Sequence, residues 1–356
     1  MSNFDVIHLV SSLKIGGAER FVIDLSKEQQ SEGKTVAILS FSFEDDPLVE
    51  IAKKEDITVF FINKKWWNNT LALIKIFGAT KVIHCHSLPV MQSICLTLPL
   101  LRKKRIIYTR HGERDISTSI LKMVHWFAKP FIDVITFVSQ GAKDKFISQT
   151  QWLNKPAYVV ENGVNTALFN RKIQNINSGS VVRFGSVGRM IPIKAQHHLL
   201  EAVNQLTDKK KSQCELHFIG DGPCKKYIEK SPVRNKSNIK SYFHGMLMGR
   251  NNIFDKFDVL VVNSETEGLS IAIIEAMAFG MPVIATKVGG NPRLVLPNKT
   301  GWLYEFNDII SLANIIESIL KDKGIIAQFG RNAKEHIKTN FSIEKTAKIY
   351  NKLYEE

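Results

Sequence analysis

The sequence lacks the features of membrane-spanning and secreted proteins. No stretch approaches about 18 uninterrupted apolar residues, the length at which a spanning helix is expected. The opening residues, MSNFDVIHLVSSLKIGG, carry an acidic residue and no basic one before a short apolar run. That pattern is typical of a first buried strand and not of a signal peptide. We therefore expect a cytoplasmic protein.

Cysteine is scarce, and its spacing predicts neither a disulfide framework nor a zinc site. The four residues Cys85, Cys95, Cys214 and Cys224 show no CxxC pair and are expected to be reduced thiols. His84 and His86 share one face of an expected strand in HCHS, but no nearby acidic residue completes a metal site. We expect no metal.

Three catalytic signatures are also missing. The sequence contains no GxSxG, HExxH or GxxxxGK[ST], which argues against a serine hydrolase, a zincin and a P-loop NTPase. What the chain does have is ordinary globular composition, with 44% hydrophobic and 23% charged residues. Its net charge of +14 attracts polyanions of any kind, so a basic nucleic-acid-binding protein remains an alternative.

Short apolar runs alternate with helical segments and predict two α/β domains. Parallel sheets built from βαβ units follow from this alternation, and 356 residues suffice for two domains. The polar interval NRKIQNINSGSV separates the two series of strands. The expected parts are a domain over residues 1–168, a second over 169–340 and a helix over 341–356 packing back on the body. The expected runs are FDVIHLV, TVAILSF, ITVFFI, KVIHCHS, RIIYTRH, VITFVS and AYVVENG, then VRFGSVGR, ELHFIGDG, IKSYFHG, DVLVVNS, PVIAT and GWLYE.

Helices are expected between these runs, for example over residues 18–32, 195–206 and 309–321. Ligands of doubly wound sheets bind beyond the carboxyl ends of the strands. A cleft between the two domains is therefore the expected site.

The stretch EGLSIAIIEAMAFGMPVIA holds two glutamates, Glu267 and Glu275, beside an expected phosphate pocket. A strand, a loop containing Gly268 and Leu269, and a helix capped by Ser270 place backbone N–H groups and a helix dipole around an anion. Carboxylates repel phosphate, so their partners should be hydroxyl groups. The pattern indicates a sugar nucleotide, although a capped amphipathic helix with incidental acids explains it equally well.

The segment FGSVGRMIPIKAQHH places two cations on one loop that follows a strand. Arg189 and Lys194 there can clamp a diphosphate and neutralise the charge that grows as it leaves. In the first half, Gly16 and Gly17 lack the full GxGxxG but permit close approach of a ligand. His111 ends the run RIIYTRH, where its imidazole can hydrogen-bond a sugar hydroxyl or take part in proton transfer.

Taken together, these motifs resemble the retaining glycosyltransferases of family GT4, which have the GT-B fold with two facing Rossmann-like domains. The resemblance rests on GGAER, TRHGE, ENGVNTALF, SVGRMIPIKA, IGDGP, EGLSIAIIEAMAFGMPVIATKVGG and FSIEKTAKIYNKLYEE, in that order along nearly the whole chain. It implies a hexosyltransferase that uses a nucleotide diphosphate sugar, with UDP preferred, and needs no metal or other cofactor.

The resemblance also implies roles for the motif residues. Arg189 and Lys194 would hold the diphosphate, Glu275 the ribose hydroxyls and Glu267 the donor sugar, while the N–H groups of Gly268, Leu269 and Ser270 cradle the phosphate. His111 would touch the sugar, and Gly16 and Gly17 would line the diphosphate and acceptor side. No protein nucleophile is required, because front-face attack lets the departing phosphate accept the proton. Arg293 departs from the family, which often has a glutamate there, and is left out of the site.

Three first-domain segments, NKKWWNN, LTLPLLRKKR and LKMVHWFAKPF, mix basic with aromatic or apolar residues. Each is typical either of a solvated basic helix face or of a membrane interface. Peripheral attachment to the inner face of the membrane would fit a lipid-linked saccharide acceptor in bacterial-type surface polysaccharide or lipopolysaccharide synthesis. A nucleotide-sugar epimerase of similar fold is the alternative enzyme, and a phosphorylase would need a longer chain.

Overall fold

A computed structural model describes residues 3–62, 70–113, 115–116, 118–150, 152, 154–169, 173, 177, 179–233 and 239–356. These residues form two compact units. Unit 1 runs to Gly163 and also includes Ile343–Glu356, whereas unit 2 is the continuous segment Val164–Ser342.

Unit 1 contains a seven-stranded parallel sheet in the order β3-β2-β1-β4-β5-β6-β7. From β1 the chain adds β2 and then β3 on one side. It then returns to the other side of β1 and adds β4, β5, β6 and β7 in turn. The strands are β1 Phe4–Val10, β2 Val36–Ser40, β3 Thr58–Phe61, β4 Thr80–Cys85, β5 Arg105–Arg110, β6 Val134–Phe137 and β7 Ala157–Val159.

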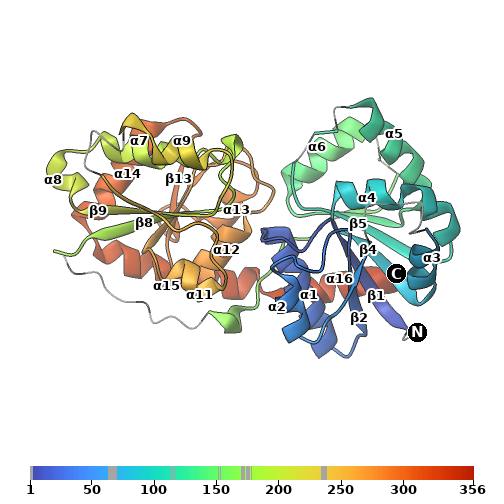
Figure 1. Cartoon of the computed structure of the whole chain (residues 1–356). Coiled ribbons are helices and arrows are strands. Elements are labelled where there is room, and N and C mark those ends of the chain that lie inside the picture. The colour runs from blue at the N-terminus through green and yellow to red at the C-terminus, as the bar shows by residue number, and fades with distance from the viewer. Residues whose placement is uncertain are drawn as a thin grey trace. The chain divides into compact units, whose positions relative to one another are not determined.

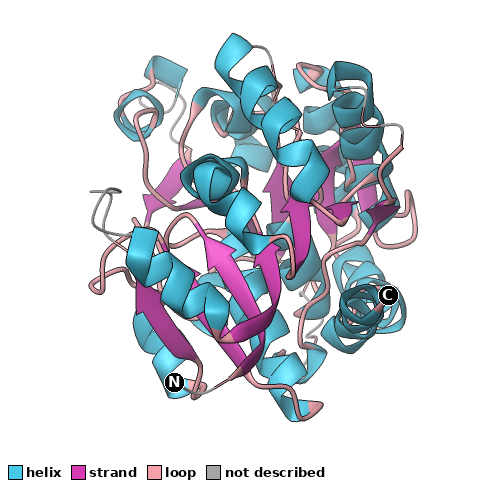
Figure 2. Ribbon diagram, turned by 90° about the vertical axis from the view of Figure 1, so that its right-hand side faces the viewer, coloured by secondary structure: helices cyan, strands magenta, loops and turns pink. Residues whose placement is uncertain are grey.

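Helices cover both faces of this sheet (Figure 2). On one face α1 packs against α16, the last helix of the chain, and Figure 1 shows the red α16 among the blue elements of unit 1. The helices of unit 1, with 3-10 helices marked η, are α1 Gly17–Ser31, α2 Val49–Lys54, α3 Thr70–Gly78, α4 Leu88–Ile94, η2 Cys95–Leu101, α5 Ser119–Ala128, η3 Lys129–Phe131, α6 Gln140–Thr150 and α16 Ile343–Glu355.

Unit 2 repeats the scheme with a six-stranded parallel sheet in the order β10-β9-β8-β11-β12-β13. The chain leaves β8 first toward β9 and β10, then returns to build β11, β12 and β13 on the other side. The strands are β8 Val182–Val187, β9 Cys214–Ile219, β10 Lys240–Phe243, β11 Val259–Val262, β12 Val283–Thr286 and β13 Gly301–Tyr304.

The helices of unit 2 form two layers, with α7 against α14 and α12 against α15. Figure 1 shows α7 and α14 on one side of this sheet and α15 on the other. The helices are η4 Thr166–Leu168, η5 Pro192–Lys194, α7 His197–Asn204, α8 Asp208–Lys211, α9 Lys225–Glu229, α11 Arg250–Phe254, α12 Ile271–Ala278, α13 Asn291–Leu294, α14 Ile309–Lys321 and α15 Gly324–Asn340.

The strand predictions are confirmed, because each of the thirteen apolar runs overlaps one of the observed strands, and only β4 and β9 begin one residue before their runs. Strands covered on both faces read as continuous apolar runs, and the middle strands β1, β8 and β11 are almost wholly buried. Each unit has its own hydrophobic core. The α/β class and its two Rossmann-like sheets follow from this pattern.

One helix begins later than predicted. Residues 195–206 were expected to be helical, but Ala195 has a φ of 42° and ends the short helix η5, so that α7 starts at His197. The turn Pro192–Lys194 therefore closes on a left-handed residue before the helix begins. The other two helix predictions agree with α1 and α14 to within one residue at each end.

Candidate functional site

The loops after β8 and β11 lie side by side at the carboxyl edge of the unit 2 sheet. These strands are neighbours, and the chain departs from them in opposite directions, which makes this the topological switch point of the sheet. A backbone hydrogen bond from Glu265 N–H to the carbonyl oxygen of Ile193 joins the two loops over 2.8 Å. Ligands of doubly wound sheets bind at this place.

Lys194 and Glu267 meet across this switch point. The Lys194 Nζ lies 2.5 Å from Glu267 Oε1, and the hydroxyl of Ser264 donates to the same oxygen over 2.7 Å. Glu267 is 11% exposed and Lys194 is 26% exposed, so the pair is shielded from most solvent. The sequence predicted both side chains at this site, and the structure brings them into contact. Arg189, the other predicted cation, projects an exposed side chain from the same loop.

The glycines of the β8 and β9 loops permit very close backbone packing. Gly220 has a φ of 132°, and a Cβ atom there would lie 2.0 Å from the carbonyl oxygen of Gly188. The backbone N–H of Met190 donates to the carbonyl oxygen of Asp221 over 2.8 Å. The GDG segment therefore holds the loop that carries Arg189 and Lys194.

The N-terminus of α12 directly follows the loop that carries Glu267. Gly268, Leu269 and Ser270 are buried there, and Gly290 donates its N–H to the carbonyl oxygen of Gly268 over 2.8 Å. Ser270 occupies the predicted N-cap position, but its hydroxyl makes no capping bond to the described residues. The predicted side-chain cap is therefore wrong. The helix dipole and the first N–H groups of α12 remain a favourable environment for an anion.

Glu275 has a partner that the sequence did not reveal. Arg250, the first residue of α11, donates from Nε to Glu275 Oε1 over 2.7 Å, and its guanidinium lies 5.3 Å from the centre of the Phe169 ring. Both charged side chains are nearly buried, at 9% and 13% exposure. No motif marks Arg250, since it lies 25 positions from its partner in a short helix. The only available signal was that a shielded carboxylate requires a cation.

Gly16 and Gly17 begin α1 in unit 1. Gly16 is the N-cap residue, and the carboxylate of Glu19 folds back over it, since a Cβ on Gly16 would lie 2.2 Å from Glu19 Oε2. An acidic side chain thus covers this helix terminus in the structure. Arg293, whose role the sequence left open, places its guanidinium 5.2 Å from the centre of the Phe341 ring in unit 2.

His111 directly follows β5, and its ring is turned toward the interior of unit 1. Its Nε2 lies 3.0 Å from Nδ1 of His86, and its Nδ1 is buried with no hydrogen-bond partner in the described part of the chain. Burial lowers the pKa of His111 to about 4, and an interaction with Asn162 opposes this shift. The imidazole is therefore neutral at physiological pH.

Two of the three candidate membrane segments lie in the described part of the chain. Both carry large apolar side chains in solvent, namely Leu96 and Leu100 on η2 and Ile120, Met123 and Trp126 on α5, each more than 60% exposed. The helices η2 and α5 contact one another, so we call these five residues the apolar patch. The segment NKKWWNN lies outside the described residues. None of the helices in the described ranges has the length and apolar character needed to cross a membrane.

Two protein-family models together cover residues 15–336 of the chain. The family model described as glycosyl transferases group 1 matches residues 168–336, and that of glycosyltransferase family 4 matches residues 15–168. An uncharacterized glycosyltransferase of Methanocaldococcus jannaschii is 33% identical over 260 residues, which are 70% of this chain and 68% of that protein.

Two further proteins illustrate the range of similarity. An Escherichia coli enzyme named UDP-Gal:alpha-D-GlcNAc-diphosphoundecaprenol alpha-1,3-galactosyltransferase is 29% identical over 70% of this chain and 68% of its own length. The structure of Anabaena HepE in complex with UDP and glucose superposes with a TM-score of 0.84 at 20% identity, covering 98% of this chain and 99% of that one. The superposition identifies the two-unit fold as GT-B. This chain belongs to the group 1 glycosyltransferases of family 4 and is a glycosyltransferase.

Proposed function

We propose that the chain transfers a sugar from a nucleotide diphosphate sugar, with UDP as the nucleotide, and retains the anomeric configuration. The observation that carries this proposal is the contact between Lys194 and Glu267 beside the α12 N-terminus. The cation and the helix dipole there can each bind one phosphate of such a donor, and the carboxylate can bind its sugar hydroxyl groups.

The proposed roles follow from where each charge lies. Arg189 and Lys194 hold the diphosphate and stabilise the leaving group, while the N–H groups of Gly268, Leu269 and Ser270 bind one phosphate. Glu275, oriented by Arg250, accepts hydrogen bonds from the ribose. When the diphosphate draws Lys194 away, Glu267 is released toward the donor sugar. Since the side chains and helix terminus supply positive charge, transfer proceeds without a metal.

The support for UDP is the chemistry named for similar proteins, namely HepE in complex with UDP and glucose and the UDP-Gal-dependent E. coli enzyme. The latter acts on a diphosphoundecaprenol-linked sugar by name. A saccharide or lipid-linked saccharide acceptor in surface polysaccharide synthesis is therefore part of the proposal. Gly16 and Gly17 would line the acceptor side, and His111 would contact the transferred sugar.

The apolar patch extends the proposal to the membrane. The buried face of α5 contains His125 and Ala128, while Ile120, Met123 and Trp126 are exposed, so large apolar side chains of this helix lie in solvent. Basic residues of the same segments, including Arg102, Lys103 and Lys122, would contact anionic headgroups. We propose that this patch inserts into the headgroup boundary of an anionic membrane and brings the enzyme to its acceptor.

A thermal-shift panel tests the donor site first. UDP, GDP, ADP and CMP and their common sugar conjugates are compared with and without EDTA. We expect a rise in Tm with UDP and UDP-sugars that EDTA leaves unchanged and Lys194→Met abolishes. Lys209→Met, on the exposed helix α8, is the matched control and should respond as wild type. Absence of any nucleotide effect on folded protein would contradict the proposal, and RNA binding that survives physiological salt would favour the nucleic-acid alternative.

A further inference from the structure

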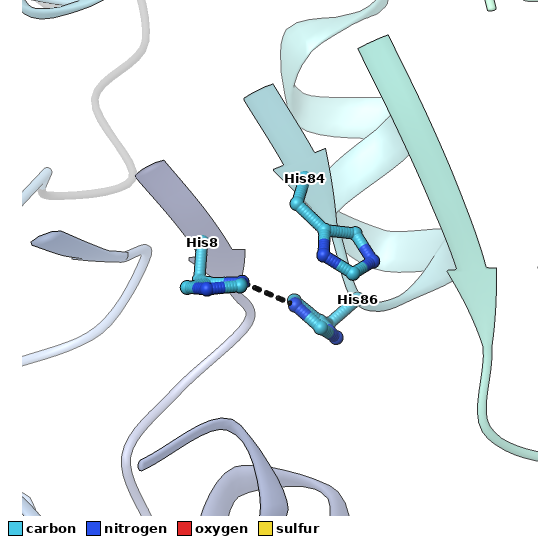
Figure 3. A group of neighbouring side chains, drawn as sticks. All are labelled: His8, His84 and His86. Carbon is cyan, nitrogen blue, oxygen red and sulfur yellow. Dashed lines mark hydrogen bonds between the residues drawn. The ribbon is translucent and has the colours of Figure 1, made fainter. Parts of the chain in front are cut away.

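A group of histidines lies at the switch point of the unit 1 sheet. His8 is on β1 and His84 is its neighbour on β4, while His86 directly follows β4. All three are buried, and Figure 3 shows His8 and His86 joined by a hydrogen bond with the His84 ring alongside. The sequence had singled out His84 and His86 but not His8, which lies 78 positions before His86.

Every ring nitrogen in this group already has a hydrogen-bond partner. His8 bonds His86 over 2.9 Å and Gln29 over 2.8 Å, and His86 bonds His111 over 3.0 Å through its other nitrogen. His84 lies 2.7 Å from the Tyr354 hydroxyl and 2.6 Å from Thr109 Oγ1. A metal ion would have to displace these bonds. In the structure the group forms a hydrogen-bond network.

Burial keeps the histidines neutral. It lowers the pKa of His8 and of His111 to about 4 and lowers the pKa of His84 and of His86 well below the usual value. A neutral imidazole has one N–H donor and one acceptor nitrogen. Fixing the role of one nitrogen in the chain consequently fixes all the others.

Glu32 determines which atom donates and which accepts in each hydrogen bond of this network. A carboxylate only accepts hydrogen bonds, so Asn351 must donate to Glu32 through Nδ2. Asn351 Oδ1 then faces Gln29 and accepts from Gln29 Nε2 over 3.1 Å. The same Gln29 nitrogen donates to the Tyr354 hydroxyl over 3.3 Å. Gln29 must therefore present its carbonyl oxygen to His8.

The orientation of Gln29 determines the donor and acceptor nitrogens of three imidazoles in turn. His8 donates to Gln29 from Nε2, which leaves its Nδ1 as an acceptor for the N–H of His86 Nε2. His86 Nδ1 is then an acceptor, so His111 must donate to it from Nε2. The Nδ1 of His111 is left with a lone pair and no proton.

The far end of the chain lies beside the loop after β7. His111 Nδ1 and Asn162 Oδ1 are both buried, and neither has a hydrogen-bond partner among the described residues. As placed, Asn162 raises the pKa of His111, whereas half a turn of its amide would let the NH₂ group donate to His111 Nδ1. A ligand hydroxyl is the alternative donor, and it would have to displace Asn162 from this buried nitrogen. Whichever donor binds, the nitrogen that it meets is an acceptor.

We propose that Gln29 and Asn351 are positioning residues that hold His111 in the Nε2–H tautomer, so that His111 accepts a hydrogen bond at Nδ1 and never donates a proton there. The role of that acceptor rests on the proposed function, in which it receives a hydroxyl group of the transferred sugar. A bare Nδ1 can accept a hydrogen bond from a hydroxyl group but has no proton to give, so the network excludes proton donation from this nitrogen. α16 contributes both Asn351 and the Tyr354 hydroxyl.

Nitrogen NMR of the full chain labelled with ¹⁵N-histidine tests the tautomer without reference to activity. Long-range ¹H–¹⁵N correlation spectra between pH 6 and pH 8 distinguish protonated from bare ring nitrogens, and His111→Gln assigns the signal. We expect wild-type His8, His86 and His111 each to show a protonated Nε2 and a bare Nδ1. A protonated Nδ1 on His111, or an equal mixture of tautomers, would overturn the proposal.

Two variants separate positioning from stability. Gln29→Met removes the acceptor that orients His8, and we expect mixed tautomers at His8, His86 and His111. Tyr354→Phe removes a buried hydroxyl from the same network but leaves Gln29 bonded to Asn351, so only the His84 signal should change. Identical His111 signals in the two variants would contradict the proposal that the series of hydrogen bonds from Gln29 through His8 and His86 sets the tautomer of His111. The wild-type spectrum remains decisive even if Gln29→Met fails to fold.

Kinetics then test the link to the sugar. An equal tautomer mixture halves the competent population, so Gln29→Met should raise the KM for the sugar donor about twofold or more. Affinity for the free nucleotide selected by the thermal-shift panel should not change. Altered tautomers with unchanged KM would overturn the assigned role of His111, whereas absence of nucleotide binding by wild type would overturn only the proposed function.

Discussion

Arg250 Nε donates to Glu275 Oε1 over 2.7 Å inside unit 2, with both side chains nearly buried. Removing one partner of a buried ion pair leaves a charge without compensation. We therefore expect substitutions in this pair to affect the free energy of unfolding and the binding of the nucleotide in different ways.

The first prediction separates these two effects. Arg250→Met should lower the free energy of unfolding by about 3 kcal/mol, because Glu275 keeps its charge without its partner. The double variant Arg250→Met/Glu275→Leu should regain most of that loss in urea unfolding, yet should not recover nucleotide binding. Recovery of binding by the double variant would show that Glu275 does not contact the donor.

The second prediction concerns Gly220. Gly220→Ala combines a φ of 132° with a Cβ placed 2.0 Å from the backbone oxygen of Gly188, so the two loops must separate. We expect a loss of about 2–4 kcal/mol by chemical denaturation. Gly245→Ala is the control, because its φ is 65° and no atom lies within 4 Å of the added Cβ. It should cost about 1 kcal/mol. Equal losses in the two variants would exclude the clash as the cause.

The third prediction is that stability falls as the solution is acidified below about pH 6.5. Burial lowers the pKa of His8, His125, His198 and His217 to about 4 in the folded protein, so the unfolded chain binds more protons between these values. The fully buried His8 removes up to about 1.4 kcal/mol per pH unit on the way from pH 6.5 to 4, and the other three, which solvent screens more, remove less. Urea midpoints at pH 7.5, 6 and 5 measure the slope.

Asp5 provides the contrast for that experiment. A hydrogen bond from Lys81 lowers the pKa of Asp5 to about 2, so its contribution is lost only below about pH 4. A stability profile that stays flat from pH 7 to pH 5 and falls only below pH 4 would assign acid unfolding to carboxylates and contradict the role of the histidines.

The fourth prediction concerns the apolar patch. Trp126, 75% exposed on α5, should insert into the interface, so Trp126→Ser should reduce flotation with anionic liposomes several-fold. Tyr227→Ser, an exposed aromatic in unit 2, is the matched control. Neutral liposomes should bind wild type weakly. Equal binding by all three proteins, or binding that ignores lipid charge, would rule out the patch as the contact.

Much of this architecture was predictable from the sequence because local patterns determine it. Buried parallel strands are continuous apolar runs, and the switch-point residues Lys194 and Glu267 lie in loops that directly follow such runs. Contacts between distant segments carry no such pattern. Arg250 beside Glu275 and His8 beside His86 depend on strand order and helix placement, which the sequence does not display.

Local geometry accounts for the remaining differences. Ser270 stands at the predicted N-cap, yet its hydroxyl does not cap α12, because residue type gives a preference and not a side-chain rotamer. Ala195 has good helix propensity, but the turn after Pro192 places it in the left-handed region. In both places tertiary context overrides a local preference.

The return of α16 to unit 1 has a consequence for how the chain acquires its structure. Unit 2 is continuous and can complete its core as soon as Ser342 has been synthesised, whereas unit 1 must wait for a helix that follows it. Until α16 docks, Gln29 lacks Asn351 and Tyr354, and the buried histidines have no fixed direction. The tautomer of His111 is therefore among the last features of the structure to be fixed. It depends on α16, which is synthesised after the strands of both sheets.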